Sequence, residues 1–462
     1  MKLIYQIGRL ERGAFNPIKF EINGNVYEAQ LSSFALRNHF QNTGVPSKVV
    51  LIYPISLLLN KIVLNFEGIS DELKDVIKQI VNKEKIEDYL RDPYPYFEKH
   101  PHSKIADDFL VIHSVGEYEG ISFQATLEDL ILEIFVDMVS RYQNEPFTEL
   151  YLDISSGHNI YVSALLEAGR LFLTFYKLQN FCPDGEKLKA YITFSDPILP
   201  PYDRKFTIHK KFSLKVKAFF NYPRTPDNKI IEDGYSRFAK HLMGNDEELR
   251  KKRKILNELF SYGYFFYSAI KNNIPLILYT WEYHSEEKID EGVSLLTTFI
   301  KEKLSANYQS TPKLDFNLFR DAFLMLALYR GTAKVLQNRG IYKKEEVSLN
   351  EIKNVFLAKE NKEKNPYMCF ELTHHIAYLS HEINNTFEKS SERGGVYELI
   401  PENYVLLREL IKGESEGIND RNFLAHCGFE RNCIYVKKVN NEIFIKYDQT
   451  KLKAIESILM RA

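Results

Sequence analysis

Apolar and polar positions follow different patterns in the two halves of the chain. In about the first two hundred residues, short apolar runs alternate with stretches of helical spacing. The runs predict five strands, at residues 2–7, 49–53, 109–113, 149–154 and 189–194. Strands that alternate with helices in this way are typical of βαβ units, so the pattern predicts a parallel, Rossmann-like sheet.

The second half has longer helical patterns. Apolar residues recur every three or four positions in two stripes, Phe316, Phe319, Phe323 and Leu326, and then Leu372, Ile376, Leu379, Ile383 and Phe387. Such stripes are typical of helices that pack against a core. Near the end, residues 433–447 predict a β-hairpin that turns at Asn440-Asn441, and residues 452–460 predict a final helix.

A stretch rich in proline separates the two patterns, and it suggests a domain boundary. We therefore expect an α/β, Rossmann-like domain at residues 1–196 and a connector at 197–234, with a short strand within 211–220. An all-α domain with a small β-hairpin is expected at 235–462.

Composition narrows the function classes. With 61 Lys and Arg against 62 Asp and Glu, the chain has no global positive field, so any nucleic-acid site must be a local patch. No run of about twenty apolar residues predicts a membrane span. The four cysteines form no C-x-x-C pair and the first residues show no signal-peptide pattern, so we expect reduced thiols and a cytoplasmic protein.

Two segments at predicted strand ends are suited to a polar ligand. One is Gly8-Arg9, after the first strand, and the other follows the fourth strand and consists of Ser155, Ser156, Gly157, His158 and Asn159. Ligands of open α/β sheets bind beyond the carboxyl ends of the strands, and a helix N-terminus offers backbone N–H groups to phosphate. The alternative is that these serines and the glycine only cap a helix.

A second constellation, Arg421-Asn422-x-x-x-His426, lies near the C-terminus. RNA cleavage without metal needs groups that move protons and a positive donor for the phosphoryl oxygens, and histidine and arginine supply these. We expect Arg421 at a helix start capped by Asn419 or Asp420, and two copies of the motif across a two-fold axis would ease its geometry. The alternative is an Arg and a His on an ordinary helix.

Three histidines, His374, His375 and His381, invite a metal site but fit it poorly. His374 and His381 would lie about 10.5 Å apart along a helix, and His374 and His375 would point about 100° apart. We therefore expect neither a metal nor another cofactor.

The two constellations, in this order, resemble the CARF–HEPN ribonucleases, the Csx-type accessory RNases of type III CRISPR systems. The strings that carry the resemblance are YLDISSGHNIYVSALLEAG and RNFLAHCG, and it covers nearly the whole chain. It implies an endoribonuclease of antiviral defence with a CARF-like sensor domain and a HEPN-like nuclease domain. By position, Arg421, Asn422 and His426 match the family's catalytic motif.

The resemblance also implies partners and a mechanism. The sensor pocket, at Gly8-Arg9 and residues 155–159, would bind a cyclic oligoadenylate activator, with cyclic tetra-adenylate as the expected ring. A homodimer or a dimer-based higher oligomer would then cut single-stranded RNA without metal, leaving a 2′,3′-cyclic phosphate. Other CARF proteins often have Thr and Lys in the pocket loop, so the ring size and any degradation of the ligand stay open.

Two other classes of protein remain possible at this point. The chain could be a non-catalytic ligand-sensing protein that binds nucleic acid or regulates, which would bind the ligand without turnover. It could also be a small-molecule α/β enzyme, although no G-x-G-x-x-G follows the first strand.

Overall fold

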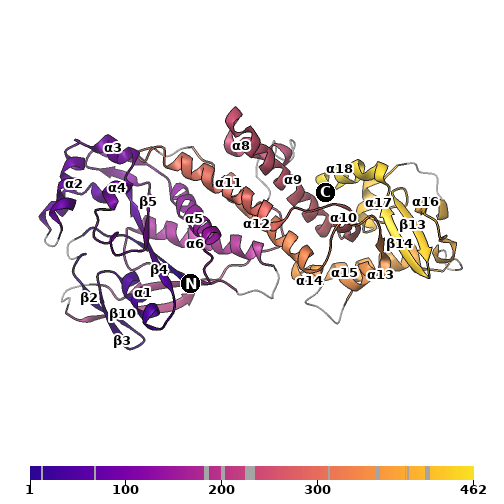
Figure 1. Cartoon of the computed structure of the whole chain (residues 1–462), viewed down its shortest axis with the longest axis horizontal. Helices are drawn as coiled ribbons and strands as arrows, with labels where there is room; N and C mark the ends of the chain where they lie inside the picture. Colours follow the sequence, from indigo (N-terminus) through magenta and orange to yellow (C-terminus); the bar gives the residue numbers. More distant parts are fainter. Residues whose placement is uncertain are drawn as a thin grey trace. The chain divides into compact units, whose positions relative to one another are not determined.

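A computed structural model describes residues 1–11, 14–66, 69–181, 187–198, 203–223, 235–310, 313–358, 365–390, 392, 395–411 and 417–462. The chain forms two compact units (Figure 1). Unit 1 comprises Met1–Tyr176, Glu186–Lys217 and Ser294–Arg320. Unit 2 comprises Lys177–Gly185, Ala218–Val293 and Asp321–Ala462.

Unit 1 is built on an eight-stranded sheet with the order β3-β2-β10-β9-β8-β1-β4-β5. Its strands are β1 (Lys2–Ile7), β2 (Ile18–Ile22), β3 (Asn25–Ala29), β4 (Ser47–Pro54), β5 (Asp108–Ile112), β8 (Glu149–Asp153), β9 (Lys189–Ser195) and β10 (Lys205–Ser213). The five predicted strands are β1, β4, β5, β8 and β9, which are adjacent and mutually parallel. The predicted Rossmann-like sheet is therefore confirmed.

The other strands of the sheet were missed or misplaced. Strands β2 and β3 form a hairpin that turns at Asn23-Gly24, where φ is 50° and 81°. An Asn-Gly pair between alternating runs is a strong hairpin signal that the sequence offered. The strand expected within 211–220 instead begins at Lys205 and ends at Ser213, because it pairs with both β9 and β2 and buries Phe206 there.

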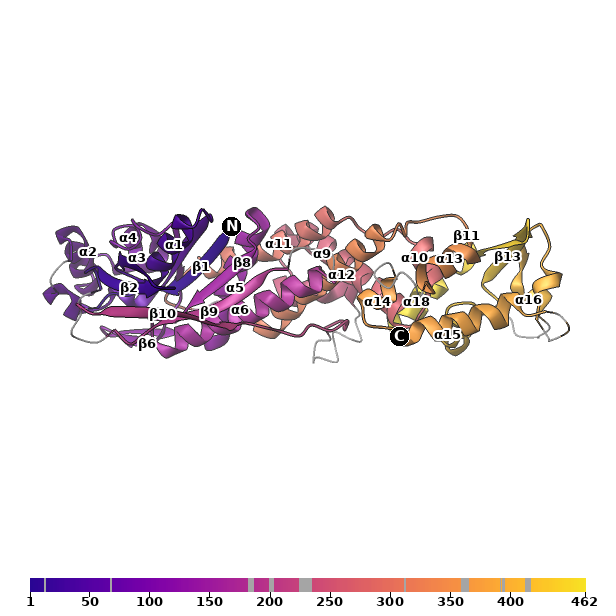
Figure 2. The same ribbon diagram turned by 90° about the horizontal axis from the view of Figure 1, so that it is seen from below.

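Helices cover both faces of this sheet (Figure 2). Helices α1 (Ser32–Asn42), α2 (Asp71–Val81), α3 (Ile86–Arg91) and α4 (Tyr94–Phe97) share a core with Ile4 of β1. Helices α5 (Leu127–Asn144) and α6 (Asn159–Gln179) lie on the opposite face, where the Tyr5 hydroxyl donates to Asp137 at 2.7 Å. Successive residues of a strand point to opposite faces, so β1 joins both helical layers. A small hairpin, β6 (Val115–Tyr118) and β7 (Ile121–Gln124), stands apart from the large sheet.

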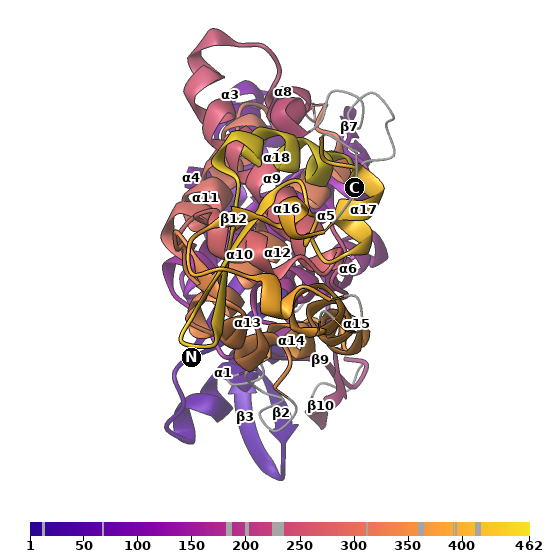
Figure 3. The same cartoon turned by 90° about the vertical axis from the view of Figure 1, so that its right-hand side faces the viewer.

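Unit 2 is mainly helical (Figure 3). Its elements include α8 (Phe238–Met243), α9 (Arg250–Lys271), α10 (Pro275–Thr280), α13 (Leu349–Phe356), α14 (Pro366–Cys369), α15 (His374–Ile383), α16 (Leu407–Leu410), α17 (Asp420–Ala425) and α18 (Leu452–Arg461). Helices α11 (Glu286–Leu304) and α12 (Phe316–Asn338) also contribute residues. The predicted all-α character of this part is confirmed.

Unit 2 also holds a four-stranded antiparallel sheet with the order β11-β14-β13-β12. Its strands are β11 (Val347–Ser348), β12 (Val405–Leu406), β13 (Ile434–Val439) and β14 (Glu442–Tyr447). Asn440 and Asn441, with φ of 51° and 64°, form the turn between β13 and β14, so the predicted hairpin is confirmed. Both apolar stripes bury residues, including Phe323 in α12 and Leu379 in α15.

Within the described ranges, every helix is too short or too polar to cross a membrane.

Candidate functional site

The first candidate site lies where the strand order reverses in the sheet of unit 1. Strands β1 and β8 are neighbours, and among the five parallel strands β1 is followed by β4 on one side while β8 is followed by β9 on the other. Such a switch point is where open α/β sheets bind ligands. Gly8-Arg9 follows β1 and residues 155–159 follow β8, and the Ser156 hydroxyl donates to the Ile7 carbonyl at 2.9 Å. The structure therefore brings the two predicted ligand segments together.

Two buried polar residues beneath this edge, Gln6 and Asp153, escaped the sequence analysis. The Gln6 amide donates to the hydroxyl oxygens of Ser32 and Ser156, both at 3.0 Å. The Asp153 carboxylate accepts from the Ser32 hydroxyl at 3.0 Å and from the Ser155 backbone N–H at 2.9 Å. Burial raises the pKa of Asp153 above its usual value. A polar residue inside an apolar strand was the signal that could have found both.

The serines of the loop after β8 are bonded inside the protein. The Ser155 hydroxyl accepts from the Ser195 N–H at 2.8 Å, and the Ser156 hydroxyl has the two bonds described above. Gly157 has φ of 112°, and a Cβ there would lie 2.7 Å from the Ile7 Cβ, so this position requires glycine. His158 and Asn159 are exposed at the start of α6. A ligand would therefore meet these two residues and the N–H groups of the helix start.

Two buried histidines fix the chain after β1. The Nε2 of His100 donates to the Arg9 carbonyl at 3.1 Å, and the Nε2 of His102 donates to the Ala14 carbonyl at 3.0 Å. The Nδ1 of His100 accepts from the His102 backbone N–H at 3.2 Å, which assigns the proton to Nε2. Burial lowers the pKa of both rings, that of His102 to about 4, so both are neutral near pH 7. Arg9 itself pairs with Glu11.

The second candidate site is on α17 in unit 2. The Asn419 side chain accepts from the Asn422 N–H at 2.9 Å, which confirms the predicted cap and places Arg421 in the first turn. Asp420 is the first helical residue and pairs with Arg461 at 2.7 Å. Gly428 closes the segment with φ of 75°, where a Cβ would lie 2.3 Å from Ile274. This close packing fixes the turn that carries His426.

The three motif side chains all face solvent. Arg421, Asn422 and His426 are exposed, and no residue of the described chain bonds to the Arg421 or Asn422 side chain. The Nδ1 of His426 lies 3.0 Å from Oε2 of Glu382, whose side chain is 10% exposed against 52% for His426. A guanidinium, an amide and the Nε2 side of an imidazole are thus available to a substrate.

Helix α15 supplies two residues that the sequence analysis missed. Besides Glu382, the Tyr378 hydroxyl donates to the Ala425 carbonyl at 2.8 Å. In the sequence, this helix is marked only by its apolar stripe. Because Glu382 and His426 are 44 positions apart, no local spacing could reveal the pair.

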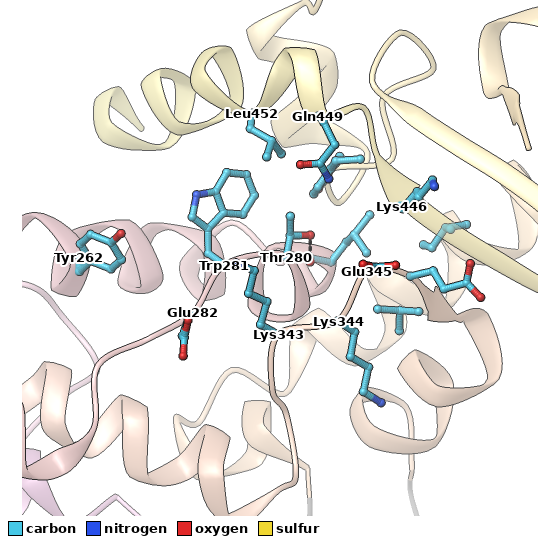
Figure 4. A pocket seen from close by; sticks show the side chains of 15 residues that line it. Tyr262, Thr280, Trp281, Glu282, Lys343, Lys344, Glu345, Lys446, Gln449 and Leu452 are labelled. Atoms are coloured by element: carbon cyan, nitrogen blue, oxygen red, sulfur yellow. Dashed lines mark hydrogen bonds between the residues drawn. The ribbon is translucent and has the colours of Figure 1, made fainter.

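A cavity of about 750 Å³ lies in unit 2 (Figure 4). Trp281 projects from the end of α10 toward Leu452 at the start of α18. No predicted site residue lines the cavity. Its charged side chains are balanced, and they are Lys343, Lys344 and Lys446 against Glu282, Glu345 and Glu346. This balance does not favour a phosphate site.

The described residues contain no group of three His, Cys, Asp or Glu side chains placed to hold a metal. His375 is buried and its Nε2 donates to the Lys271 carbonyl at 3.0 Å, while His381 bonds to Asn385. Cys427 and Cys433 are buried free thiols, the Arg339 guanidinium lies 3.7 Å from the Cys369 Sγ, and Cys182 lies outside the described residues.

Two family models match the chain. The CARF domain of the CRISPR system endoribonuclease Csx1 matches residues 2–197, and the HEPN domain of the same endoribonuclease matches residues 372–449. No curated protein matches the chain. The first match contains all five parallel strands, and the second contains α15, α17 and the β13–β14 hairpin.

Fold and site define a class of protein in which an α/β sensing domain accompanies a ribonuclease domain. The chain belongs to the Csx1 family of CRISPR endoribonucleases. Members serve type III CRISPR defence, with a CARF domain that implies binding of cyclic oligoadenylate and a HEPN domain that implies an RNA substrate. The HEPN match shows that the chain is an enzyme, and it thereby excludes the non-catalytic alternative.

Proposed function

We propose that Arg421, Asn422 and His426 are the catalytic residues of a metal-independent endoribonuclease that cuts single-stranded RNA. The observation that carries this is the state of His426, whose Nδ1 is engaged by Glu382 while its side chain is 52% exposed. That leaves Nε2 for the RNA. Arg421 would stabilise charge on the phosphoryl oxygens, and the Asn422 amide would orient the RNA or the imidazole.

The proposed reaction uses the ribose 2′-hydroxyl as the nucleophile. An imidazole Nε2 takes the proton of this hydroxyl while the 2′-oxygen forms a bond to phosphorus. The bond between phosphorus and the 5′-oxygen breaks, and an imidazolium gives that oxygen a proton. The products are a 2′,3′-cyclic phosphate and a 5′-hydroxyl.

We also propose that the active form is a homodimer or a dimer-based higher oligomer. The motif of each chain supplies one histidine, His426, whereas the reaction uses both a base and an acid. Two copies related by a two-fold axis would supply both from the same sequence.

For the sensor site, we propose cyclic tetra-adenylate as the activator, held by Gly8, Arg9 and the loop of residues 155–159. The position of both segments at the switch point supports this, as does the start of α6 behind the loop. A symmetric ring on a two-fold axis would contact the same residues of both chains, and tighter binding to the active arrangement would shift the population toward it. A cytoplasmic location fits such a role.

The test is an RNA cleavage assay in EDTA, with and without cyclic tetra-adenylate, on the wild-type chain and on His426→Ala. We expect cleavage by the wild type to persist in the chelator and to rise with the activator. His426→Ala should lose it. Cleavage that stops in EDTA, or an active His426→Ala, would contradict the proposed chemistry, and a wild type indifferent to the ring would contradict the proposed activator.

A further inference from the structure

Helix α15 bonds to two consecutive residues of the catalytic segment, Ala425 and His426. Tyr378 and Glu382 are four positions apart, so they share one face of the helix. The Tyr378 hydroxyl donates to the Ala425 carbonyl at 2.8 Å, and the Glu382 carboxylate meets the Nδ1 of His426 at 3.0 Å. One helix face therefore holds both the backbone before the histidine and the histidine ring.

The His426–Glu382 pair has a fixed end and an open end. The Glu382 side chain is only 10% exposed, whereas that of His426 is 52% exposed. A carboxylate only accepts hydrogen bonds, so the proton shared with it belongs to Nδ1 of the ring. In the neutral ring the lone pair is then on Nε2, on the side away from Glu382.

We propose that Glu382 is a positioning residue for His426, with Tyr378 as its auxiliary on the preceding peptide. Glu382 fixes the Nδ1–H tautomer and the direction of the ring, so that Nε2 is the atom that exchanges protons with the RNA. A ring in the other tautomer would present an N–H where the 2′-hydroxyl needs an acceptor. This inference rests on the proposed function, in which His426 moves the protons.

The contacts of Glu382 and Tyr378 differ from those of the residues that pack this region. Phe387, on the short segment η6 (Asn384–Glu388) after α15, makes an apolar ring contact with Phe429 at 5.1 Å. Tyr378 is 48% exposed, so the loss of its hydroxyl leaves no internal cavity. The apolar residues of this region thus hold the fold, while Glu382 and Tyr378 reach the turn of His426 through polar bonds.

The main test is Glu382→Gln in the full chain, assayed on single-stranded RNA with cyclic tetra-adenylate present. Glutamine keeps the shape, but its amide can also donate to Nδ1 and so permits the other tautomer. We expect kcat to fall by about 10²-fold or more while KM stays within about twofold. Glu382→Asp should recover part of the loss, because the carboxylate is retained.

A spectroscopic readout gives the test a second arm. In the wild type, ¹⁵N shifts of the His426 ring should report a protonated Nδ1 in the neutral form, and in Glu382→Gln they should report a mixture of tautomers. Tyr378→Phe should lower kcat by about 2- to 10-fold, as the loss of one hydrogen bond does. Glu388→Gln is the matched control, because Glu388 pairs with Lys353 and should leave both readouts unchanged.

Wild-type kcat in Glu382→Gln, or an unchanged tautomer signal, overturns the inference. This failure differs from that of the proposed function, which would be shown by an active His426→Ala. If His426→Ala is inactive and Glu382→Gln is fully active, the histidine is catalytic and only its positioning by Glu382 is refuted.

Discussion

The loop after β8 and the α17 segment, which ends with His426, both carry candidate functional residues, yet they use their polar side chains in opposite ways. In the loop, the hydroxyls of Ser155 and Ser156 are bonded to the protein itself. In the α17 segment, the side chains of Arg421 and Asn422 are exposed and bond to no described residue. The loop thus offers a shaped backbone beside the exposed His158 and Asn159, whereas the α17 segment offers its three motif side chains for chemistry.

The histidines of the two regions differ in the same way. His102 is fully buried, neutral, and donates to a backbone carbonyl. His426 is half exposed and keeps one ring nitrogen for a substrate. A substitution in the first region should therefore act through stability and ligand affinity, and one in the second through the rate of cleavage alone.

The largest effect is expected for Arg421→Ala. Loss of the guanidinium should lower RNA cleavage by about 10²- to 10³-fold, because charge on the phosphoryl oxygens is no longer stabilised. The melting temperature should shift by no more than about 2 °C, since the side chain is exposed. Arg250→Ala removes another exposed arginine of unit 2, which pairs with Glu247, and should retain full activity. A large loss of stability in Arg421→Ala would break the contrast between the two regions.

Acid should weaken the first region through His102. Burial lowers the pKa of His102 to about 4, so as pH falls below about 6.5 the unfolded chain takes up a proton that the folded chain refuses. Stability is therefore full above pH 6.5 and falls by about 3 kcal/mol on the way to pH 4. The protection of the β1 amides against hydrogen exchange, followed from pH 7 to pH 4, measures this loss of stability.

His102→Gln provides the comparison for this titration. Glutamine can still donate to the Ala14 carbonyl but does not titrate. In this variant the protection of the β1 amides should therefore depend less on pH than in the wild type. His374→Gln, at an exposed histidine, should behave as the wild type does. Equal slopes for wild type and His102→Gln would contradict the depressed pKa.

A smaller effect is expected for Gly157→Ala. The added Cβ meets Ile7 at 2.7 Å and the backbone stays at φ of 112°, so we expect a loss of about 1–3 kcal/mol. Calorimetric titration with cyclic tetra-adenylate should show an affinity at least about 10-fold lower. Gly120→Ala is the matched control, because φ there is 74° with no atom within 4 Å. If both variants behave alike, the close approach of the loop to β1 has no role.

The sequence predicted what depends on local pattern. The apolar runs predicted the parallel strands, and helix-start chemistry limited the cap to Asn419 or Asp420, of which the structure shows Asn419. The β2–β3 hairpin could also have been found, because Asn23-Gly24 separates two alternating runs. The signal for this hairpin was therefore present in the sequence, and the prediction overlooked it.

Other features depend on tertiary packing and could not be predicted. Glu382 reaches His426 across 44 positions, and His100 reaches Arg9 across 91. Strand β10 is set by its two partners in the sheet, which the proline-rich composition around it conceals. Such contacts carry no periodic signal along the chain.

The most direct test of the proposed chemistry is the identity of the RNA ends produced by the full chain in EDTA, determined by mass spectrometry. We expect fragments that end in a 2′,3′-cyclic phosphate and begin with a 5′-hydroxyl, because the 2′-oxygen attacks phosphorus and the 5′-oxygen leaves. Fragments that end in a 3′-hydroxyl and begin with a 5′-phosphate would show that water was the nucleophile and would contradict the roles given to Arg421 and His426.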